Sequence, residues 1–290
     1  MQPPFPAPVT EWHRDTYDAI NPTRPELSQK GKTIVITGGG QGIGRETIDA
    51  FAQAGATNIH ITGRTSKTLQ ESKVIHEKKY PGLSVTIHVA DVADEAAMTA
   101  AAKEIGSWDV IVANAGFLPT PGTIEKSNLA NWWSAFEIHV KGSAILAQAF
   151  LPSKKAGGTI IGTSSGAGFL PAPMPNMTNT SAYAASKIAL SRVYEFIAAE
   201  NPDLSVFNIQ PGIVDTAMYK KSGMDFEEIL DTVQLPAHFA VWLSSPEAKP
   251  FSGRFLFSNW DVTQLKEKVD RVKEDPFYLT TGLGGWPFAA

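Results

Sequence analysis

The sequence predicts an α/β protein of one domain, in which a doubly wound, parallel, seven-stranded sheet carries helices on both faces. From Lys32 onward, short apolar runs rich in β-branched residues alternate with longer stretches of helical composition. Strands separated by such helices pair in parallel through right-handed crossover connections. The runs are apolar throughout and do not alternate with polar residues, which indicates a sheet covered on both faces. The 290 residues show no linker and no internal repeat, and α/β domains of this size are often undivided.

The expected elements follow one another along the chain in a regular rhythm. The runs predicted as strands are residues 34–36, 58–62, 83–89, 109–113, 159–163, 205–209 and 254–257. The stretches predicted as helices are residues 45–54, a polar stretch ending near 79, a stretch ending near 105, 129–150 and 181–199. Two segments break the rhythm: residues 168–180, which are rich in Pro and Met, and the aromatic C-terminal segment from Phe277.

Composition and charge exclude several classes of protein. The formal net charge is −4, which gives no reason to expect a nucleic-acid partner. No apolar run approaches the roughly 18 residues that a membrane span needs. The chain has no cysteine, which excludes disulfides and thiolate metal sites, and we expect no metal ion. The first 30 residues carry acidic side chains and no long apolar stretch, unlike secretory or mitochondrial signals, so we expect a cytoplasmic protein.

A glycine-rich segment directly follows the first predicted strand and opens the first predicted helix. Glycines here allow a tight turn, close approach of the backbone to a pyrophosphate, and close contact between helix and strand. The helix N-terminus then presents unpaired N–H groups to the anion. No Lys follows the last glycine, so the segment is not the P-loop of proteins that bind nucleoside triphosphates. We therefore expect a Rossmann-type dinucleotide site with contacts from Gly38, Gly40, Gln41, Gly42, Ile43 and Gly44.

Tyr183 and Lys187 lie four residues apart at the start of the helix after the fifth strand. Residues i and i+4 share one helix face, so the ammonium group lies one turn from the phenol. A free phenol titrates at about pH 10, too high for a base at neutral pH. A fixed ammonium, with an oxidised nicotinamide ring above it, would favour the phenolate and lower the pKa of the tyrosine. Such a tyrosine can exchange a proton with an alcohol or a ketone, although the spacing also occurs by chance in many helices.

Together these motifs resemble the short-chain dehydrogenase/reductase family in its compact branch, over residues 32–262. The matching motifs are the glycine loop with Gly38, Gly42 and Gly44, then Asp91-Val92, Asn114-Ala115-Gly116, a serine after the fifth strand, Tyr183 with Lys187, and Pro211-Gly212-Ile213-Val214-Asp215-Thr216. The N-terminal segment and residues 253–255 resemble filamentous-fungal members. The resemblance implies a Rossmann fold and an NAD(P)(H)-dependent oxidoreductase that interconverts a carbonyl and a secondary alcohol by hydride transfer.

The resemblance also implies roles for individual residues. Tyr183 would be the general acid/base, and Lys187 would bind the nicotinamide ribose and lower the pKa of Tyr183. Ser165 would polarise the reacting oxygen, since the family's serine is usually the second of a pair, and Ser164 would then make only a local hydrogen bond at the strand end. Further cofactor contacts would come from Asp91 and Val92 at the adenine, from Asn114, Ala115 and Gly116, and from Pro211, Gly212, Val214 and Thr216, of which Val214 and Thr216 would hold the carboxamide. The alternative for Pro211-Gly212 is a plain turn, and for Asp91 a helix cap.

His139 departs from the family's pattern. The family usually has asparagine at this position, where it helps a water molecule relay protons to the lysine. An imidazole can still donate with one nitrogen and accept with the other. A relay role and a packing role for His139 both stay open. We expect the neutral form, because the nearby charge of Lys187 disfavours the imidazolium.

The end of the second predicted strand indicates NADP(H). Rossmann proteins that prefer NAD(H) have Asp or Glu there to accept a hydrogen bond from the ribose 2′-hydroxyl. No acid occurs between residues 50 and 70, and Arg64, with Thr65 and Ser66, offers donors for a 2′-phosphate. The alternative for Arg64 is a solvated charge at the start of a helix. Because the glycine loop has Gln41 where many NADP-preferring relatives have a basic residue, we expect NADP(H) to be preferred and NAD(H) to be usable.

Two further features bear on the substrate. Residues 171–177 lengthen the connection between Ser165 and Tyr183 relative to the family, which we interpret as an insertion at the substrate pocket, with a solvent loop as the alternative. Apolar side chains in or near the pocket loops favour a bulky apolar substrate, although such residues are more often core: Phe117, Leu118, Phe169, Met174, Met177, Met218, Trp260 and Trp286. An isomerase or cyclase, or a cofactor sensor or scaffold, remains an alternative function.

These interpretations set the expected organisation of the chain. Residues 1–30 would be an N-terminal arm, either lying on the domain or disordered. Residues 31–262 would form the Rossmann-type catalytic domain, and residues 263–290 a tail that covers the substrate pocket. By resemblance, the helices carrying His139 and Tyr183 form a dimer face, to which Trp132, Trp133 and Phe136 could contribute unless they serve the core. We expect a homodimer or homotetramer that acts on a small-molecule carbonyl or alcohol.

Overall fold

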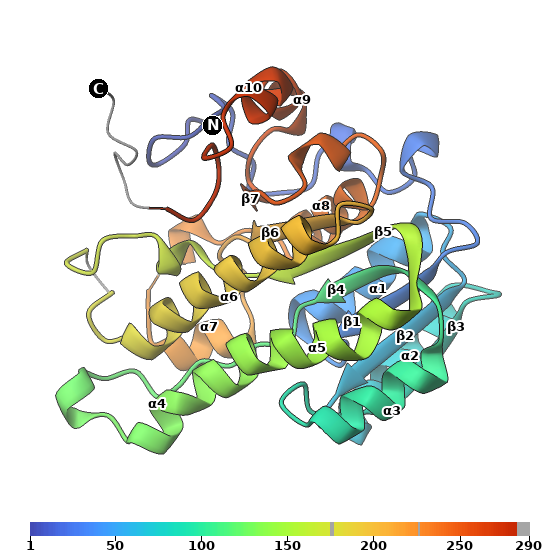
Figure 1. Ribbon diagram of the computed structural model, residues 1–290, viewed down its shortest axis with the longest axis horizontal. Coiled ribbons are helices and arrows are strands. Elements are labelled where there is room, and N and C mark those ends of the chain that lie inside the picture. The colour runs from blue at the N-terminus through green and yellow to red at the C-terminus, as the bar shows by residue number, and fades with distance from the viewer. Residues whose placement is uncertain (175–176, 226, 283–290) are drawn as a thin grey trace.

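Parallel pairing joins seven short segments into one sheet with the strand order β3-β2-β1-β4-β5-β6-β7 (Figure 1). The computed structural model describes residues 1–174, 177–225 and 227–282. The strands are β1 (Thr33–Thr37), β2 (Asn58–Gly63), β3 (Ser84–Val89), β4 (Trp108–Ala113), β5 (Lys154–Thr163), β6 (Ser205–Gln210) and β7 (Phe255–Phe257). The chain runs outward in one direction from β1 and in the other from β4, so the order reverses between these two strands. The predicted doubly wound sheet is confirmed.

Helices cover both faces of this sheet because the strand residues are buried on both sides. Helices α1, α2 and α8 pack on one face, and α3, α5 and α6 on the other (Figure 1). The helices are α1 (Gly42–Gln53), α2 (Ser66–Lys79), α3 (Glu95–Ile105), α4 (Leu129–Phe136), α5 (Gly142–Phe150), α6 (Ser181–Glu200), α7 (Ala217–Ser222), α8 (Gln234–Leu243), α9 (Val262–Lys266) and α10 (Val269–Glu274). Within the described ranges, none of these helices is long and apolar enough to cross a membrane.

The helix predicted over residues 129–150 is interrupted in its middle. Helix α4 continues into a π-helical turn over Glu137–Lys141, and α5 follows directly. His139 lies in this turn and is buried. Such turns insert a single residue and often occur at functional sites. One inserted residue changes the apolar pattern too little to be recognised from the sequence.

Helix α8 has no counterpart among the predicted elements. All of its residues from Leu235 to Leu243 are buried. A helix that is apolar on every side shows no 3.6-residue period, so the pattern that reveals surface helices is missing. Helix α1, in turn, begins at Gly42, three residues before its predicted start. There the glycine loop itself forms the first turn of the helix.

The N-terminal segment packs against the domain. Val9, Trp12, Ile20 and Leu27 are buried in the same apolar cluster as the residues of α1 and α8. Trp12 pairs with Trp260 as an isolated antiparallel bridge. In Figure 1 the blue N-terminal segment runs beside the red helices α9 and α10. The predicted boundary at residue 262 coincides with the first residue of α9, so the chain continues there in regular structure.

Candidate active site

A cavity of about 440 Å³ opens at the carboxyl ends of β1 and β4, where the strand order reverses. Open α/β sheets bind ligands at this kind of switch point. Most residues predicted to bind the cofactor line this cavity: Gly38, Gly40, Gln41, Gly42, Ile43, Arg64, Asp91, Val92, Asn114, Ala115, Gly116, Tyr183, Lys187, Pro211 and Thr216. The other three do not line the cavity. Gly44 packs against Gly38 and Asn114, and both Gly212 and Val214 lie against Asp231.

The glycine loop brings the start of α1 directly against the end of β1. A Cβ atom on Gly44 would overlap the carbonyl oxygen of Gly38 and would lie 2.6 Å from Nδ2 of Asn114. No other residue fits this contact. From the other side, the hydroxyl of Ser72 donates to the carbonyl of Gly39 at 2.9 Å. The loop is therefore held in place before any ligand binds, with the N-terminus of α1 at the cavity wall.

The loop after β4 is fastened to the end of β1 by Thr37. The carbonyl oxygen of Thr37 accepts from Nδ2 of Asn114 at 3.2 Å, and its hydroxyl oxygen accepts from the backbone N–H of Ala115 at 2.9 Å. No sequence motif predicted this role for Thr37. The only signal was a polar residue at the end of a buried apolar strand, where a hydroxyl needs a hydrogen-bond partner.

Arg64 and Thr65, which directly follow β2, line the cavity. The guanidinium of Arg64 is well exposed, and Nη1 lies 3.8 Å from Oδ2 of Asp91. Tertiary structure thus places a carboxylate beside Arg64, although no acid is near it in the sequence. Asp91 does not cap a helix: its Oδ1 accepts from the N–H of Ala93 at 3.0 Å, and Asp94 caps α3. The helix-cap alternative for Asp91 is therefore wrong.

The two neighbouring serines after β5 have different surroundings. Ser165 is hydrogen-bonded to the side chain of Tyr183 and also accepts from the N–H of Ala167 at 3.2 Å. The hydroxyl of the buried Ser164 donates to the carbonyl of Lys187 at 3.0 Å and lies 2.7 Å from the hydroxyl of Ser191. These contacts fasten β5 to α6, so the local hydrogen bond expected for Ser164 is wrong. Of the pair, Ser165 is the one whose hydroxyl meets the phenol.

Lys187 and Tyr183 share one face of α6, as their spacing predicts. Nζ of Lys187 donates to the carbonyl of Thr163 at 2.7 Å and lies 5.6 Å from the centroid of the Tyr183 ring. Burial lowers the pKa of Lys187 to about 7. Burial also raises the pKa of Tyr183, and the hydrogen bond with Ser165 opposes this in part. Among the chain's own groups, burial therefore dominates the pKa of Tyr183, and only the hydrogen bond with Ser165 lowers it; the lowering by Lys187 that the spacing suggested is not found.

Both ring nitrogens of His139 are engaged by protein groups. Nε2 accepts from the backbone N–H of Phe117 at 3.0 Å, and Nδ1 lies 2.8 Å from the hydroxyl oxygen of Ser186. Burial, followed by the charge of Lys187, lowers the pKa of His139 well below its ordinary range. The ring is thus neutral at physiological pH, and it meets the Tyr183 ring edge to face at 5.7 Å. Ser186, which no motif singled out, completes this contact.

A second cavity, of about 280 Å³, shares Tyr183 with the first. It lies between the segment before α4 and the start of α6. Its other lining residues are Leu118, Pro119, Thr120, Pro121, Gly122, Lys126, Ser127, Asn128, Asn131, Trp132, Asn179, Thr180, Ser181 and Ala182. The indole N–H of Trp132 donates to the hydroxyl of Ser181 at 3.0 Å across this space. Trp132 therefore belongs to a wall of the site.

Several apolar residues expected at the substrate pocket lie elsewhere. Trp260 is buried in the core, 4.8 Å from the ring of Phe257, so its expected place at the pocket is wrong. Phe169 packs on Phe255 at 4.4 Å between ring centroids. The described residues of the 171–177 insertion line neither cavity. Pro175, Asn176 and Trp286 lie outside the described residues.

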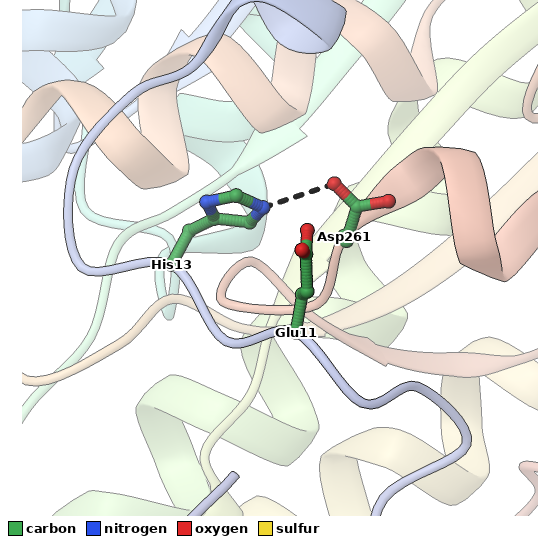
Figure 2. A group of neighbouring side chains, drawn as sticks. All are labelled: Glu11, His13 and Asp261. Carbon is green, nitrogen blue, oxygen red and sulfur yellow. Dashed lines mark hydrogen bonds and ion pairs between the residues drawn. The ribbon is translucent and has the colours of Figure 1, made fainter. Parts of the chain in front are cut away.

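Glu11, His13 and Asp261 gather at the junction of the arm and α9 (Figure 2). Their potential ligand atoms lie within 4.8 Å of one another. Nε2 of His13 is 3.0 Å from Oδ2 of Asp261, whose other oxygen caps α9. The contact between His13 and Asp261 joins the arm to the start of α9.

Comparison with known proteins gives a consistent result. The model of the short chain dehydrogenase family matches residues 32–226. The chain is 33% identical over 282 residues to the short chain dehydrogenase/reductase AacuD of Aspergillus aculeatus, covering 96% of this chain and 97% of AacuD. It is 33% identical over 278 residues to the short chain dehydrogenase mpl6 of Monascus purpureus, covering 91% and 92% of the two chains.

Solved structures agree with these sequence relatives. A Shigella flexneri protein described as a short chain dehydrogenase, complexed with NADP, superposes with a TM-score of 0.72 and 26% identity over 81% of this chain and 99% of its own. The oxidoreductase yciK of Escherichia coli superposes with a TM-score of 0.72 and 25% identity over 81% and 97%.

Proposed function

This chain belongs to the short-chain dehydrogenase/reductase family of oxidoreductases, and from that premise we propose that it interconverts a carbonyl and a secondary alcohol with NADP(H). The observation that carries the proposal is that Tyr183 and Lys187 line the cavity at the glycine loop, while the hydroxyl of Ser165 is hydrogen-bonded to the phenol of Tyr183. A hydroxyl, a phenol and a buried ammonium in contact form a set that can move a proton to or from a reacting oxygen.

The residues present fit a dinucleotide. Gly38, Gly40 and Gly42 of the glycine loop line the cavity at the start of α1, which suits a pyrophosphate. Tyr183 and Lys187 line the same cavity. A nicotinamide bound there would supply the hydride acceptor or donor and, when oxidised, a positive charge. Asp91 and Val92 would border the adenine and Thr216 the carboxamide, whereas Val214, which was predicted to share that contact, does not line the cavity.

In this mechanism Tyr183 exchanges the proton. In reduction its hydroxyl protonates the substrate oxygen, and in oxidation the phenolate takes the proton back. Ser165 donates to the same oxygen and is already hydrogen-bonded to the phenol. Lys187, whose Nζ is aimed by the carbonyl of Thr163, binds the ribose and stabilises the phenolate.

NADP(H) is the preferred cofactor in this proposal. Arg64 presents an exposed guanidinium at the cavity, with the hydroxyl of Thr65 beside it. A 2′-phosphate would compete with Asp91 for the guanidinium, and the carboxylate of Asp91 would also repel it. This competition favours a preference over exclusive use, so NAD(H) would serve as a second cofactor. The NADP complex of the Shigella relative supports the assignment.

The second cavity is the proposed place for the body of the substrate. Tyr183 also lines this cavity, so a substrate whose carbonyl lies at the phenol would extend into it. Leu118, Pro121 and Trp132 offer apolar walls for a bulky group. A homodimer or homotetramer through the faces of α4 and α6 is part of the proposal, and the exposed ring of Trp133 on α4 supports it.

Nicotinamide absorbance, followed with a panel of bulky ketones and alcohols, tests this function. We expect cofactor-dependent turnover that Tyr183→Phe abolishes. Conversion of a substrate with no change in nicotinamide absorbance would instead favour an isomerase or cyclase. Tight binding of NADP with no turnover of any ketone or alcohol would favour a cofactor sensor.

A further inference from the structure

We propose that the N-terminal arm positions the loop over residues 211–216 through Asp231 and Asn259, and thereby helps to shape the cofactor site without touching the cofactor. The proposal rests on the function above, in which this loop borders the nicotinamide. It makes Asp231 and Asn259 positioning residues, which touch neither substrate nor cofactor. In this proposal the arm supports the cofactor site in addition to packing against the domain.

Asp231 fixes the backbone of the loop over residues 211–216. The backbone N–H of Ile213 donates to Oδ2 of Asp231 at 2.7 Å, and the N–H of Asp231 donates to the carbonyl of Ile213 at 2.7 Å. A Cβ atom on Gly212, whose φ is +92°, would lie 2.5 Å from the same carboxylate oxygen. Asp231 thus fits against the backbone of the loop, directly before Val214 and Thr216.

The side chain of Asn259 connects Asp231 to the arm. Nδ2 of the buried Asn259 donates to Oδ1 of Asp231 at 2.9 Å and to the carbonyl of His13 at 2.8 Å. Both partners are acceptors, so only the amide nitrogen can face them. The N–H of His13 donates in turn to the carbonyl of Asn259 at 2.7 Å. The arm is therefore paired with Asn259 in both directions.

A second connection reaches the same point from the next residues of the arm. The N–H of Thr232 donates to the carbonyl of Arg14 at 2.8 Å, and its hydroxyl donates to Oδ1 of Asp15 at 2.7 Å. Nη1 of Arg14 donates to the carbonyl of Glu228 at 2.8 Å. The arm thus holds the segment around Asp231 on both sides of the carboxylate.

The arm can act as a support because it is itself anchored. Figure 2 shows His13 reaching Asp261 beside Glu11, and His13 also stacks on Tyr17 with 3.6 Å between ring centroids. The hydroxyl of Tyr17 donates to the carbonyl of Trp260 at 3.0 Å and accepts from the N–H of Val262 at 2.9 Å. The arm, Asp231 and Asn259 all lie outside residues 32–226, so this support is added to the part of the chain that the family model describes.

Hydrogen–deuterium exchange of the free protein tests the proposal without any substrate. In Asn259→Ala we expect amide exchange in residues 211–218 to rise about tenfold, the effect of losing one to two buried hydrogen bonds. Asp231→Asn should do the same, since Ile213 and Asn259 donate to different oxygens of the carboxylate and an amide keeps only one of them. Thr10→Ala is the matched control, because Thr10 lies in the arm but bonds only Gln264.

Turnover supplies a second readout. The KM for NADP(H) in Asn259→Ala should rise about tenfold while kcat stays within about threefold, because binding must then order the loop. Exchange in residues 211–218 equal to that of Thr10→Ala would overturn the proposal. If Asn259→Ala does not fold, Thr232→Ala decides: it removes only the bond to Asp15, and unchanged exchange in the loop would count against the arm. Failure of all nicotinamide turnover in the unmodified protein would reject the function, while the exchange result would still decide the role of the arm.

Discussion

The imidazole Nε2 of His139 accepts a hydrogen bond from the backbone N–H of Phe117 at 3.0 Å. Because an N–H can only donate, Nε2 carries no proton, and Nδ1–H donates to the hydroxyl of Ser186 at 2.8 Å. The hydroxyl of Ser186 in turn donates a hydrogen bond to the backbone carbonyl of Tyr183 at 2.9 Å. His139 thereby joins the loop after β4 to the first turn of α6, which carries the phenol.

This geometry fixes a single tautomer, which NMR can detect. The ring nitrogens of His139 should report a protonated Nδ1 and an unprotonated Nε2. Burial and the charge of Lys187 lower the pKa of this ring, so it should stay neutral as the pH falls from about 8 to about 6. An ordinary histidine becomes mostly protonated over the same range. A ring that titrates within that window, or one protonated at Nε2, would contradict the assignment.

Three roles of His139 separate in two variants: a proton relay, a hydrogen-bonded connection between Phe117 and Ser186, and plain packing. A relay predicts that His139→Asn keeps substantial activity and that His139→Leu slows proton transfer and alters the pH–rate profile. A role confined to joining Phe117 and Ser186 predicts a different result: both variants lose turnover by about tenfold, the effect of leaving one buried N–H unpaired, with the pH profile unchanged. The measurement is kcat/KM as a function of pH. Full activity in His139→Leu at every pH would reduce the residue to packing.

Tyr183→Phe should abolish hydride transfer and leave cofactor binding largely intact, because the ring still packs while the proton is lost. Lys187→Ala should weaken both, since it removes the ribose contact and the charge beside the phenol. Stopped-flow turnover and cofactor titration by fluorescence measure the two effects. A Tyr183→Phe variant that retains more than about a tenth of the rate, a loss below about 1.4 kcal/mol of barrier, would reject the mechanism.

Cofactor preference should depend on Arg64. We expect kcat/KM to favour NADP(H) over NAD(H) and Arg64→Ala to reduce that ratio about tenfold, the effect expected for one charge-assisted contact. Asp91→Asn is the matched variant, because it keeps the shape of the residue 3.8 Å from Nη1 and removes its charge. It should raise the preference for NADP(H). A ratio that favours NAD(H), or that neither substitution changes, would reject the role of Arg64.

Acid should destabilise the protein through His238 of α8. Burial lowers the pKa of His238 to about 4, and Thr16 of the arm is hydrogen-bonded to its ring. The unfolded chain then binds more protons than the folded one below about pH 6.5, so stability present above that pH is lost as the pH falls towards 4, by up to about 3 kcal/mol. Urea unfolding from pH 7 to pH 4.5 measures this slope. His238→Asn should flatten it, and an equal slope in both proteins would contradict the prediction.

Much of the fold was accessible from sequence because its signals are local. The strand β1 is a run of apolar β-branched residues, and the glycines after it permit a turn that few residues allow. The serine after β5, Tyr183 and Lys187 are likewise readable, since their spacing along a helix fixes their mutual position. The long-range partners were not readable. The contacts of Thr37, Thr163 and Ser186 reach groups 24 or more positions away, or involve backbone atoms, which are the same at every position.

Repeating patterns and fixed spacings within single elements were enough to predict the doubly wound sheet, the glycine loop after β1 and the Tyr183–Lys187 face of α6. Three other features became visible only in the folded chain: Asp91 lies beside Arg64, Trp260 is core, and Asn259 joins the arm to Asp231. The physical reason is that burial and hydrogen bonding depend on which segments meet after folding. Asn259 and His13 are 246 positions apart, and no periodicity or spacing within either segment reports the other.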